Sequence, residues 1–122
     1  MAQKILVVDD EEHIVKVVAN RLKASGYDVI TAADGLSALS SAREQKPDLI
    51  ILDIMLPKMD GYKVCRMLKF DENYKHIPII IFTARIQDSD EKTGYEVGAD
   101  AYLTKPFESQ VLLAKIEELL RK

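Results

Sequence analysis

The stretch Ile5-Leu6-Val7-Val8-Asp9-Asp10 decides the fold class of this chain. Its first four residues are apolar without alternation, and such a continuous run is typical of a strand that is buried on both faces. Strands of this kind belong to parallel sheets that helices cover on each side. Two carboxylates follow at once, so we expect the strand to end at a polar edge of the sheet.

Three further continuous apolar runs and one weaker run are predicted to be the other strands. They cover residues 29–32, 49–52, 79–82 and, less clearly, 101–104. Between and after these runs, apolar residues recur at helical spacing. The predicted helices contain Ile14, Val18 and Leu22, then Leu39, Ala42 and Arg43, then Val64 and Leu68, and the last two cover 89–97 and 108–122. Strand and helix thus alternate as (βα)5, which predicts an α/β fold: a doubly wound, mainly parallel sheet with helices on both faces.

The size and composition predict one folded domain, residues 1–122, with no output domain. A chain of 122 residues is long enough to bury a single core. Its 48% hydrophobic and 30% charged residues exclude a disordered or fibrous chain. The formal charge of −3 and the pI near 5.4 lack the basic surplus of nucleic-acid-binding proteins, so nucleic acid is not expected as a direct partner.

The cysteine content and the N-terminal residues indicate a cytoplasmic protein. A single cysteine, Cys65, cannot form an internal disulfide, and a domain without disulfides is typical of reducing compartments. The apolar run near the N-terminus is far too short for a signal peptide or a membrane span, so no membrane association is expected. We expect Cys65 to be a small, buried or half-buried thiol in the third helix. Asp60, which precedes Gly61 and a helical stretch, is expected to be an N-cap.

Polar side chains follow four of the predicted strands at their carboxyl ends, where parallel sheets of this kind bind ligands. Asp9 and Asp10 follow the first strand, and Asp53 follows the third. Thr83 follows the fourth strand and Lys105 the fifth. Because these strand ends lie on one edge of the sheet, the five side chains are expected to converge.

This set of side chains predicts phosphoryl-transfer chemistry. Carboxylates that lie within a few ångströms repel one another, and a bound cation relieves the repulsion. An oxygen-only set from Asp9, Asp10 and Asp53 favours Mg²⁺ over zinc. A lysine charge and a threonine hydroxyl suit phosphoryl oxygens. Asp53 is the best candidate for the nucleophile, because carboxylates can form aspartyl phosphates.

Five motifs, in order along the chain, resemble the receiver domains of two-component response regulators, and the resemblance covers essentially the whole chain. The loop motifs are most similar to receivers of the winged-helix transcription regulators. The family's fold is flavodoxin-like, as in the chemotaxis regulators, with strand order 2-1-3-4-5. The motifs are Val7-Val8-Asp9-Asp10-Glu11, Leu52-Asp53-Ile54-Met55-Leu56-Pro57, Met59-Asp60-Gly61, Phe82-Thr83-Ala84-Arg85 and Gly98-Ala99-Asp100-Ala101-Tyr102-Leu103-Thr104-Lys105-Pro106-Phe107.

The resemblance implies that Asp53 accepts a phosphoryl group from a phosphohistidine. The donor would be a sensor histidine kinase or a phosphotransfer protein. Mg²⁺ would be held by Asp10, Asp53 and the backbone carbonyl of Met55, with Asp9 acting through water. The chain would then be a phosphoacceptor with slow self-dephosphorylation rather than an enzyme.

The resemblance also assigns a switch next to the acceptor. Lys105 would pair with the phosphoryl oxygens, together with the hydroxyl of Thr83 and the backbone N–H of Ala84. Tyr102 would rotate inward as Thr83 moves, and the bond between Lys105 and Pro106 would be cis. Phosphorylation would thereby change the face formed by the fourth helix, the fifth strand and the fifth helix, which would bind a downstream protein or a covalently linked output domain.

The sequence gives weaker predictions for two binding surfaces, one for a second copy of the chain and one for the kinase. On the output face, the winged-helix subfamily dimerises through a charged network, of which this chain keeps Asp100 and Lys115 but has valine at Val111. The sequence therefore favours neither a monomer nor a phosphorylation-dependent dimer. The first helix has more apolar residues than one core-facing stripe requires. The extra residues include Ile14 and Val15, and the family's kinases dock on this helix. An over-wide core stripe explains the two residues nearly as well.

Two other functions compete with the receiver reading. A phosphatase with an aspartyl nucleophile would need a second catalytic Asp two residues after Asp53, where this chain has Met55. A phosphorylation-independent interaction scaffold would be indicated by loss of the acceptor, the metal-binding acids or the lysine, and none is lost. The sequence favours neither a stand-alone receiver nor a piece of a larger regulator.

Overall fold

The structure, a computed structural model, describes residues 2–83, 98–105 and 108–121. The helix predicted at 89–97 lies outside these residues. The described strands are β1 (Lys4–Val8), β2 (Asp28–Ala32), β3 (Leu49–Leu52), β4 (Ile79–Thr83) and β5 (Ala101–Thr104). The described helices are α1 (Glu12–Ala24), α2 (Gly35–Gln45), α3 (Gly61–Lys69) and α5 (Ser109–Leu120).

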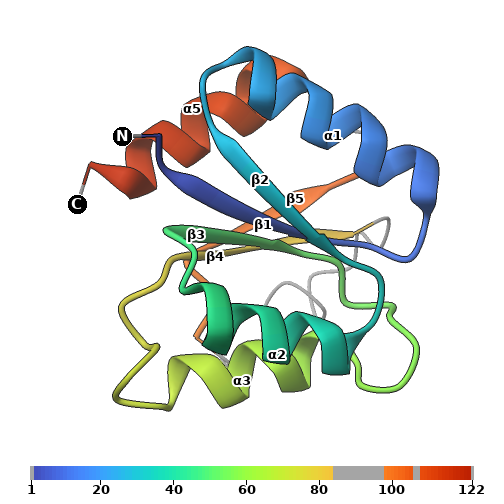
Figure 1. The fold of residues 1–122 in the computed structure, drawn as a ribbon, viewed down its shortest axis with the longest axis vertical. Helices are drawn as coiled ribbons and strands as arrows, with labels where there is room; N and C mark the ends of the chain where they lie inside the picture. The colour runs from blue at the N-terminus through green and yellow to red at the C-terminus, as the bar shows by residue number, and fades with distance from the viewer. Residues whose placement is uncertain (1, 84–97, 106–107, 122) are drawn as a thin grey trace.

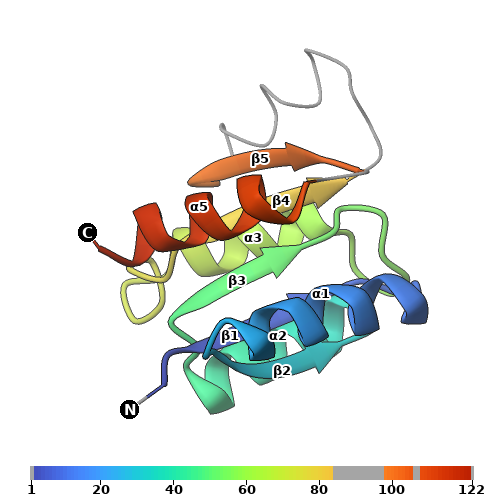
Figure 2. The same cartoon turned by 90° about the horizontal axis from the view of Figure 1, so that it is seen from above.

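The five strands form one parallel sheet in the order β2-β1-β3-β4-β5, so the predicted parallel sheet and its strand order are confirmed. All arrows point the same way in Figure 2. Val8 at the end of β1 pairs with Leu52 at the end of β3. This register brings the residues that follow both strands, Asp9 and Asp53, to neighbouring positions on one edge.

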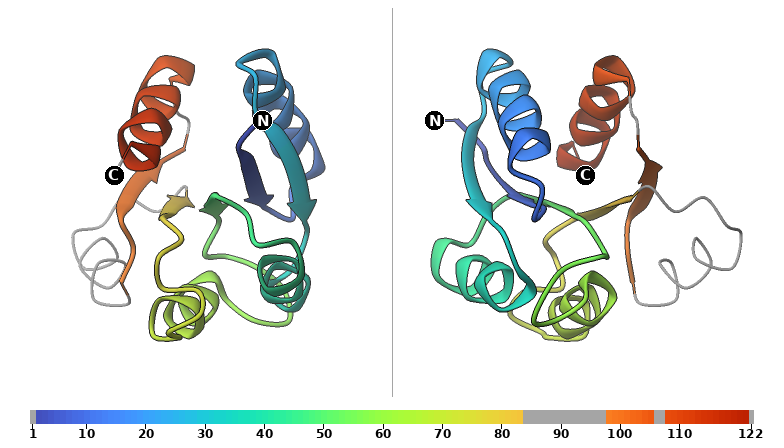
Figure 3. Two further views of the ribbon diagram at one scale, coloured as in Figure 1. Left: turned by 60° about the vertical axis from the view of Figure 1, so that its left-hand side comes forward. Right: turned by 90° about the vertical axis from the view of Figure 1, so that its right-hand side faces the viewer.

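Helices cover both faces of the sheet: α1 and α5 lie on one face and α2 and α3 on the other (Figures 1 and 3). Successive residues of β1 serve the two faces in turn. Leu6 and Val8 pack in the core beneath α2 and α3, whereas Ile5 and Val7 pack in the core beneath α1 and α5. The continuous apolar run therefore fills two cores at once, as predicted.

The run at 29–32 is a partial exception to the predicted burial. Val29 and Ile30 are only half-buried and Thr31 is exposed. The reason is that β2 lies at the edge of the sheet, where β1 is its hydrogen-bonded neighbour. An edge strand is covered less completely than a central one, and β3, at the centre, is buried at every residue.

Asp60 caps α3, as predicted, because its side chain accepts a hydrogen bond of 3.0 Å from the N–H of Lys63. Replacement of a capping Asp by Ala removes this acceptor, so we expect Asp60→Ala to lower the free energy of unfolding by about 1 kcal/mol. Asp60→Asn retains the acceptor and should match the native chain. Urea denaturation measures both, and an equal loss in the two variants would contradict the capping role.

Cys65 is fully buried on the core side of α3, and burial raises the pKa of its thiol to about 12. The thiolate, which is the reactive form, is therefore scarce in the folded chain at neutral pH. We expect a thiol reagent to label the native chain at least about 100-fold more slowly than the urea-unfolded chain, because labelling requires opening of the core. Equal labelling rates would show that the thiol is accessible.

No helix in the described part of the chain combines the length and the apolar character needed to cross a membrane.

Candidate functional site

The carboxyl edge of the sheet brings three acids together. The N–H of Asp53 donates to the carbonyl of Val8 at 2.9 Å, which extends the pairing of β3 with β1 by one residue. Asp9, Asp10 and Asp53 each offer a carboxylate oxygen within 4.8 Å of the others. The sequence prediction that these side chains converge is therefore supported by their positions.

Lys105, which follows β5, inserts its ammonium among these acids. Its Nζ lies 2.6 Å from Oδ2 of Asp9 and 3.4 Å from Oδ2 of Asp53. The same Nζ is 5.2 Å from the centre of the Phe82 ring, which forms one wall of its environment. In this arrangement the lysine is bound more closely to Asp9 than to Asp53.

Glu11 is a further acid at the site that the sequence analysis did not assign. Its Oε1 lies 3.6 Å from Nζ of Lys105, and its N–H donates to Oδ1 of Asp9 at 3.0 Å. The sequence feature that could have predicted this role is the position of Glu11 directly after Asp10. The carboxyl group is half in solvent, so its attraction for Lys105 is screened more than that of Asp9.

Asp53 is 4% exposed, and the environment of its carboxylate is unfavourable for charge. Burial raises the pKa of Asp53 above its ordinary value, and the charge of Asp9 acts in the same direction. The N–H of Met55, which donates to Oδ1 of Asp53 at 3.2 Å, and the ammonium of Lys105 oppose this shift. Met55 and Lys105 thus donate to one oxygen of Asp53 each, but the net effect of the environment is still to raise the pKa of Asp53 and favour the protonated carboxyl.

Lys105 holds a positive charge at this edge despite being largely buried. Burial acts to lower the pKa of Lys105, but its hydrogen bond to Asp9 and the charges of Asp53 and Asp9 together raise it. The ammonium is therefore protonated at neutral pH. It balances only part of the charge of the three aspartates.

The acidic cluster fits a hard divalent cation. Three carboxylates have mutually close oxygens, and the ammonium of Lys105 pairs with two of them, Asp9 and Asp53, among the side chains that the structure describes. Their donor atoms are all oxygens, which suits Mg²⁺ and not a metal that prefers sulfur or nitrogen. Asp10 is exposed while Asp9 and Asp53 are buried, so the cluster opens to solvent on the Asp10 side.

Gly61 at the start of α3 fixes the loop that carries Asp53. Its N–H donates to the carbonyl of Ile54 at 3.0 Å. A Cβ at this position would lie 2.2 Å from the carbonyl oxygen of Asp53 and 2.6 Å from Cα of Ile54. Only glycine permits this approach of helix and loop.

The other predicted site residues are described to different extents. Thr83 ends β4, but its side chain lies outside the described part, as do Ala84 and Pro106, so the Lys105–Pro106 bond is untested. Tyr102 is half-buried and packs against the core beneath α2 and α3. On α1, Ile14 and Val15 are both half-buried.

Asp100, expected on a charged surface network, instead makes contacts within the chain. Its Oδ2 accepts hydrogen bonds from Nζ of Lys69 at 2.9 Å and from the N–H of Ile79 at 2.8 Å. Lys115 pairs with Glu118 one turn later on α5. Both charges that the network would use are thus already paired in this structure.

Family and sequence relatives agree with the geometry. A family model described as "Response regulator receiver domain" matches residues 5–117. The chain is 49% identical over 122 residues to the alkaline phosphatase synthesis transcriptional regulatory protein PhoP of Bacillus subtilis, covering all of this chain (100%) and 50% of PhoP. It is 44% identical over 119 residues to the transcriptional regulator RpaA of Synechocystis, covering 98% of this chain and 49% of RpaA. The chain spans about half the length of these curated relatives.

Solved structures share the fold over the whole chain. A putative response regulator from Chloroflexus aurantiacus superposes with a TM-score of 0.95 at 34% identity, covering 100% of both chains. The receiver domain of a sensor histidine kinase from Pseudomonas aeruginosa, solved with a magnesium ion coordinated in its active-site cleft, superposes with a TM-score of 0.92 at 34% identity and the same coverage.

Proposed function

Because the chain belongs to the response regulator receiver domain family of two-component systems, we propose that Asp53 is its phosphoacceptor. The observation that supports this assignment best is the environment of the Asp53 carboxylate. It is buried at the carboxyl end of the central strand, each of its oxygens has a donor, and two further acids adjoin it. Among the described carboxylates, only that of Asp53 accepts hydrogen bonds from both Lys105 and Met55 and lies at the end of the central strand.

In the proposed reaction, a carboxylate oxygen of Asp53 attacks the phosphorus of a phosphohistidine. The new bond joins that oxygen to phosphorus, and the bond between phosphorus and the histidine nitrogen breaks. The electron pair of the broken bond stays on the imidazole, which takes up a proton from solvent. Lys105 would then contact phosphoryl oxygens, and the Thr83 hydroxyl and the Ala84 N–H would complete the set of donors.

Receiver domains bind Mg²⁺ at an acidic pocket, and the aspartates of this chain fit the ion. We assign it to Asp10, Asp53 and the backbone carbonyl of Met55, with Asp9 acting through water. When bound, Mg²⁺ would offset the negative charge that gathers between the carboxylates and the incoming phosphoryl group. The ammonium of Lys105, held by Asp9, needs only a short side-chain movement to reach groups on Asp53.

The consequences of phosphorylation are proposed from the family. Thr83 and Tyr102 would switch the face formed by the fourth helix, β5 and α5, and the signal would pass to a downstream protein or a linked output domain. Sequence relatives are named as transcriptional regulators, which favours a transcriptional output. The kinase or phosphotransfer protein would dock near Ile14 and Val15 on α1. Self-dephosphorylation would be slow, and the site of action would be the cytoplasm.

Intact-mass spectrometry after incubation with acetyl phosphate and Mg²⁺ tests the assignment of Asp53. The native chain should gain the mass of one phosphoryl group in an acid-stable, base-labile form, and the gain should vanish without Mg²⁺. Asp53→Asn keeps the size of the side chain but removes the nucleophile, so it should gain nothing. Phosphorylation of this variant at a comparable rate would disprove the assignment, and a native chain that neither reacts nor binds Mg²⁺ would favour the scaffold function.

A further inference from the structure

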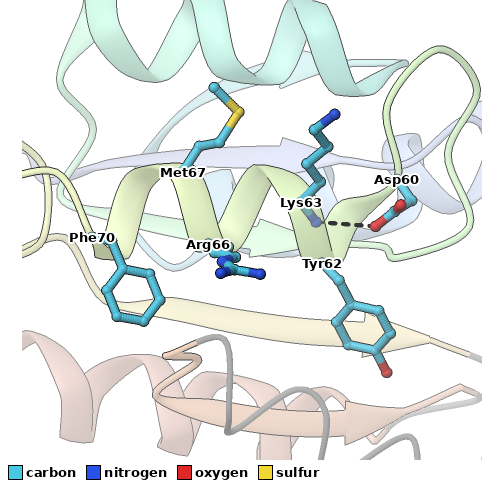
Figure 4. A pocket seen from close by; sticks show the side chains of 6 residues that line it. All are labelled: Asp60, Tyr62, Lys63, Arg66, Met67 and Phe70. Carbon is cyan, nitrogen blue, oxygen red and sulfur yellow. Dashed lines mark hydrogen bonds between the residues drawn. The ribbon is translucent and has the colours of Figure 1, made fainter.

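The outer face of α3 carries a groove whose lining includes none of the residues assigned to the phosphoacceptor site. The core face of this helix is formed by Val64, Cys65 and Leu68. On the other side, a groove of about 690 Å³ is lined by Asp60, Tyr62, Lys63, Arg66, Met67 and Phe70. Figure 4 shows Lys63 and Met67 on one side of the helix, Tyr62 and Phe70 on the other, and Arg66 between them.

The groove is unusually apolar for a solvent-facing helix surface. Phe70 is 69% exposed and Met67 is 37% exposed. Neither side chain belongs to a core cluster, so the stability of the fold does not account for their apolar character. Exposed aromatic and methionine side chains that adjoin an arginine are typical of protein-binding surfaces.

The spacing of these residues suits a helical partner. Tyr62, Arg66 and Phe70 follow one another at intervals of four residues, and Lys63 and Met67 form a second row with the same interval. Rows of this kind are the ridges between which a ridge of another helix packs. A partner helix would place apolar residues at the same interval in the space between the two rows.

The positive charges of Lys63 and Arg66 in the groove indicate the charge of the partner. Lys69 and Lys75, next along the chain, are paired with Asp100 and Glu72. By contrast, Lys63 and Arg66 have no ion-pair partner among the residues that the structure describes, although the chain as a whole carries a formal charge of −3. Asp60 is bound at the helix end to the N–H of Lys63. Two cations that lack an ion-pair partner in the described part of the chain lie beside an apolar strip, and this combination complements an acidic amphipathic surface.

We propose that the outer face of α3 is a docking site for an acidic amphipathic helix of a partner protein. Apolar side chains of that helix pack against Met67 and Phe70, and its carboxylates pair with Arg66 and Lys63. Arginine is suited to this role because its planar fork binds a carboxylate through two hydrogen bonds. Asp53 does not line the groove, so docking does not require the phosphoacceptor function.

A synthetic helical peptide provides the probe, with leucines four residues apart and glutamates flanking them. Titrated into the ¹⁵N-labelled full chain, it should shift amide signals of residues 62–70 most and leave those of Asp9 and Lys105 unchanged. A peptide with lysine in place of every glutamate should bind about tenfold more weakly or not at all. Asp53→Asn should bind the acidic peptide as the native chain does, which separates this proposal from the proposed function.

Variants of exposed residues supply the controls. Arg66→Glu and Phe70→Ala should each weaken binding of the acidic peptide about tenfold, with melting temperatures close to native. Arg21→Glu reverses an exposed charge on α1, on the opposite face of the sheet, and should bind normally. Unchanged binding by Arg66→Glu, equal binding of the basic peptide, or shifts centred elsewhere would each overturn the proposal. It would also be overturned by Phe70-dependent self-association in sedimentation equilibrium or by preferential binding to anionic vesicles.

Discussion

Lys105→Met should slow phosphorylation by acetyl phosphate at least about 100-fold, because it removes the cation that faces the transferred group. Loss of one electrostatic donor to a developing charge typically costs about 10²–10³ in rate. The ammonium now lies 3.4 Å from Asp53 and is the one charged donor that the described residues direct at that carboxylate. Methionine is similar in length, so packing beside the Phe82 ring is largely kept. The rate is measured by intact mass at saturating Mg²⁺.

The same substitution should also destabilise the fold. Lys105 is 11% exposed, and removing it leaves the buried carboxylates of Asp9 and Asp53 without their shared cation. Removal of one partner from a buried ion pair typically costs about 3–5 kcal/mol. Mg²⁺ can replace the lost positive charge, so it should raise the melting temperature of Lys105→Met more than that of the native chain. Calorimetry with and without Mg²⁺ measures both effects.

The stability of Lys105→Met relative to native should depend on pH in a defined direction. Lys105 lowers the pKa of Asp53, so its loss raises that pKa further above the ordinary value of 3.8. A raised pKa means that the folded state binds the proton more tightly than the unfolded state, so the penalty is complete above the raised pKa and is relieved as the pH falls through it. The difference in free energy of unfolding should therefore shrink on acidification without Mg²⁺.

Two control variants show whether the effects are specific to Lys105 and whether its charge alone accounts for them. Lys63→Met removes an exposed lysine without an ion-pair partner among the described residues, so both rate and stability should stay near native. Lys105→Arg keeps the charge and should retain more of the stability than of the rate, because the planar guanidinium does not reproduce the geometry of a compact ammonium. A native rate in Lys105→Met would remove this residue from the proposed site.

The positions of Asp9, Asp53 and Lys105 could be predicted because they depend on topology. Parallel strands place their carboxyl ends on one edge, and the apolar runs identify the strands directly. Once strand order is known, the residue that follows each strand has little freedom of position. The convergence of these three residues was therefore a reliable inference from sequence.

Features that depend on side-chain partners could not be predicted in the same way. Nζ of Lys105 lies closer to Asp9 than to Asp53, and the two distances differ by less than an ångström. Asp100 bonds to Lys69 because the end of α3 meets the start of β5, which no local pattern indicates. The limited burial of Val29 follows from the edge position of its strand, although its sequence run looks like that of a central strand.

The glycine at position 61 shows how a fold requirement and a site requirement coincide in one residue. A Cβ there would meet three backbone atoms, at 2.2 Å, 2.6 Å and 2.9 Å, and all of them belong to Asp53 or Ile54. Backbone atoms cannot move aside as the end of a flexible side chain can. Any side chain at this position must therefore push α3 away from the loop after β3.

Gly61→Ala should lower the free energy of unfolding by about 2–4 kcal/mol, since overpacking against backbone is among the more costly core changes. It should also slow phosphorylation roughly 10–100-fold, because a displacement of about 1 Å at a reacting group typically costs that much. Both effects have one cause, the shift of the Asp53 backbone. Urea denaturation and the intact-mass assay measure them on the same preparation.

Gly26→Ala is the matched control for Gly61→Ala. Gly26 has a φ of +94°, so alanine there is strained, but a Cβ would meet no atom within 4 Å. We expect a loss of about 1 kcal/mol from the backbone conformation and an unchanged phosphorylation rate. If Gly61→Ala lost stability but phosphorylated at the rate of Gly26→Ala, the loop would tolerate the displacement, and the close approach of Gly61 would serve the fold alone.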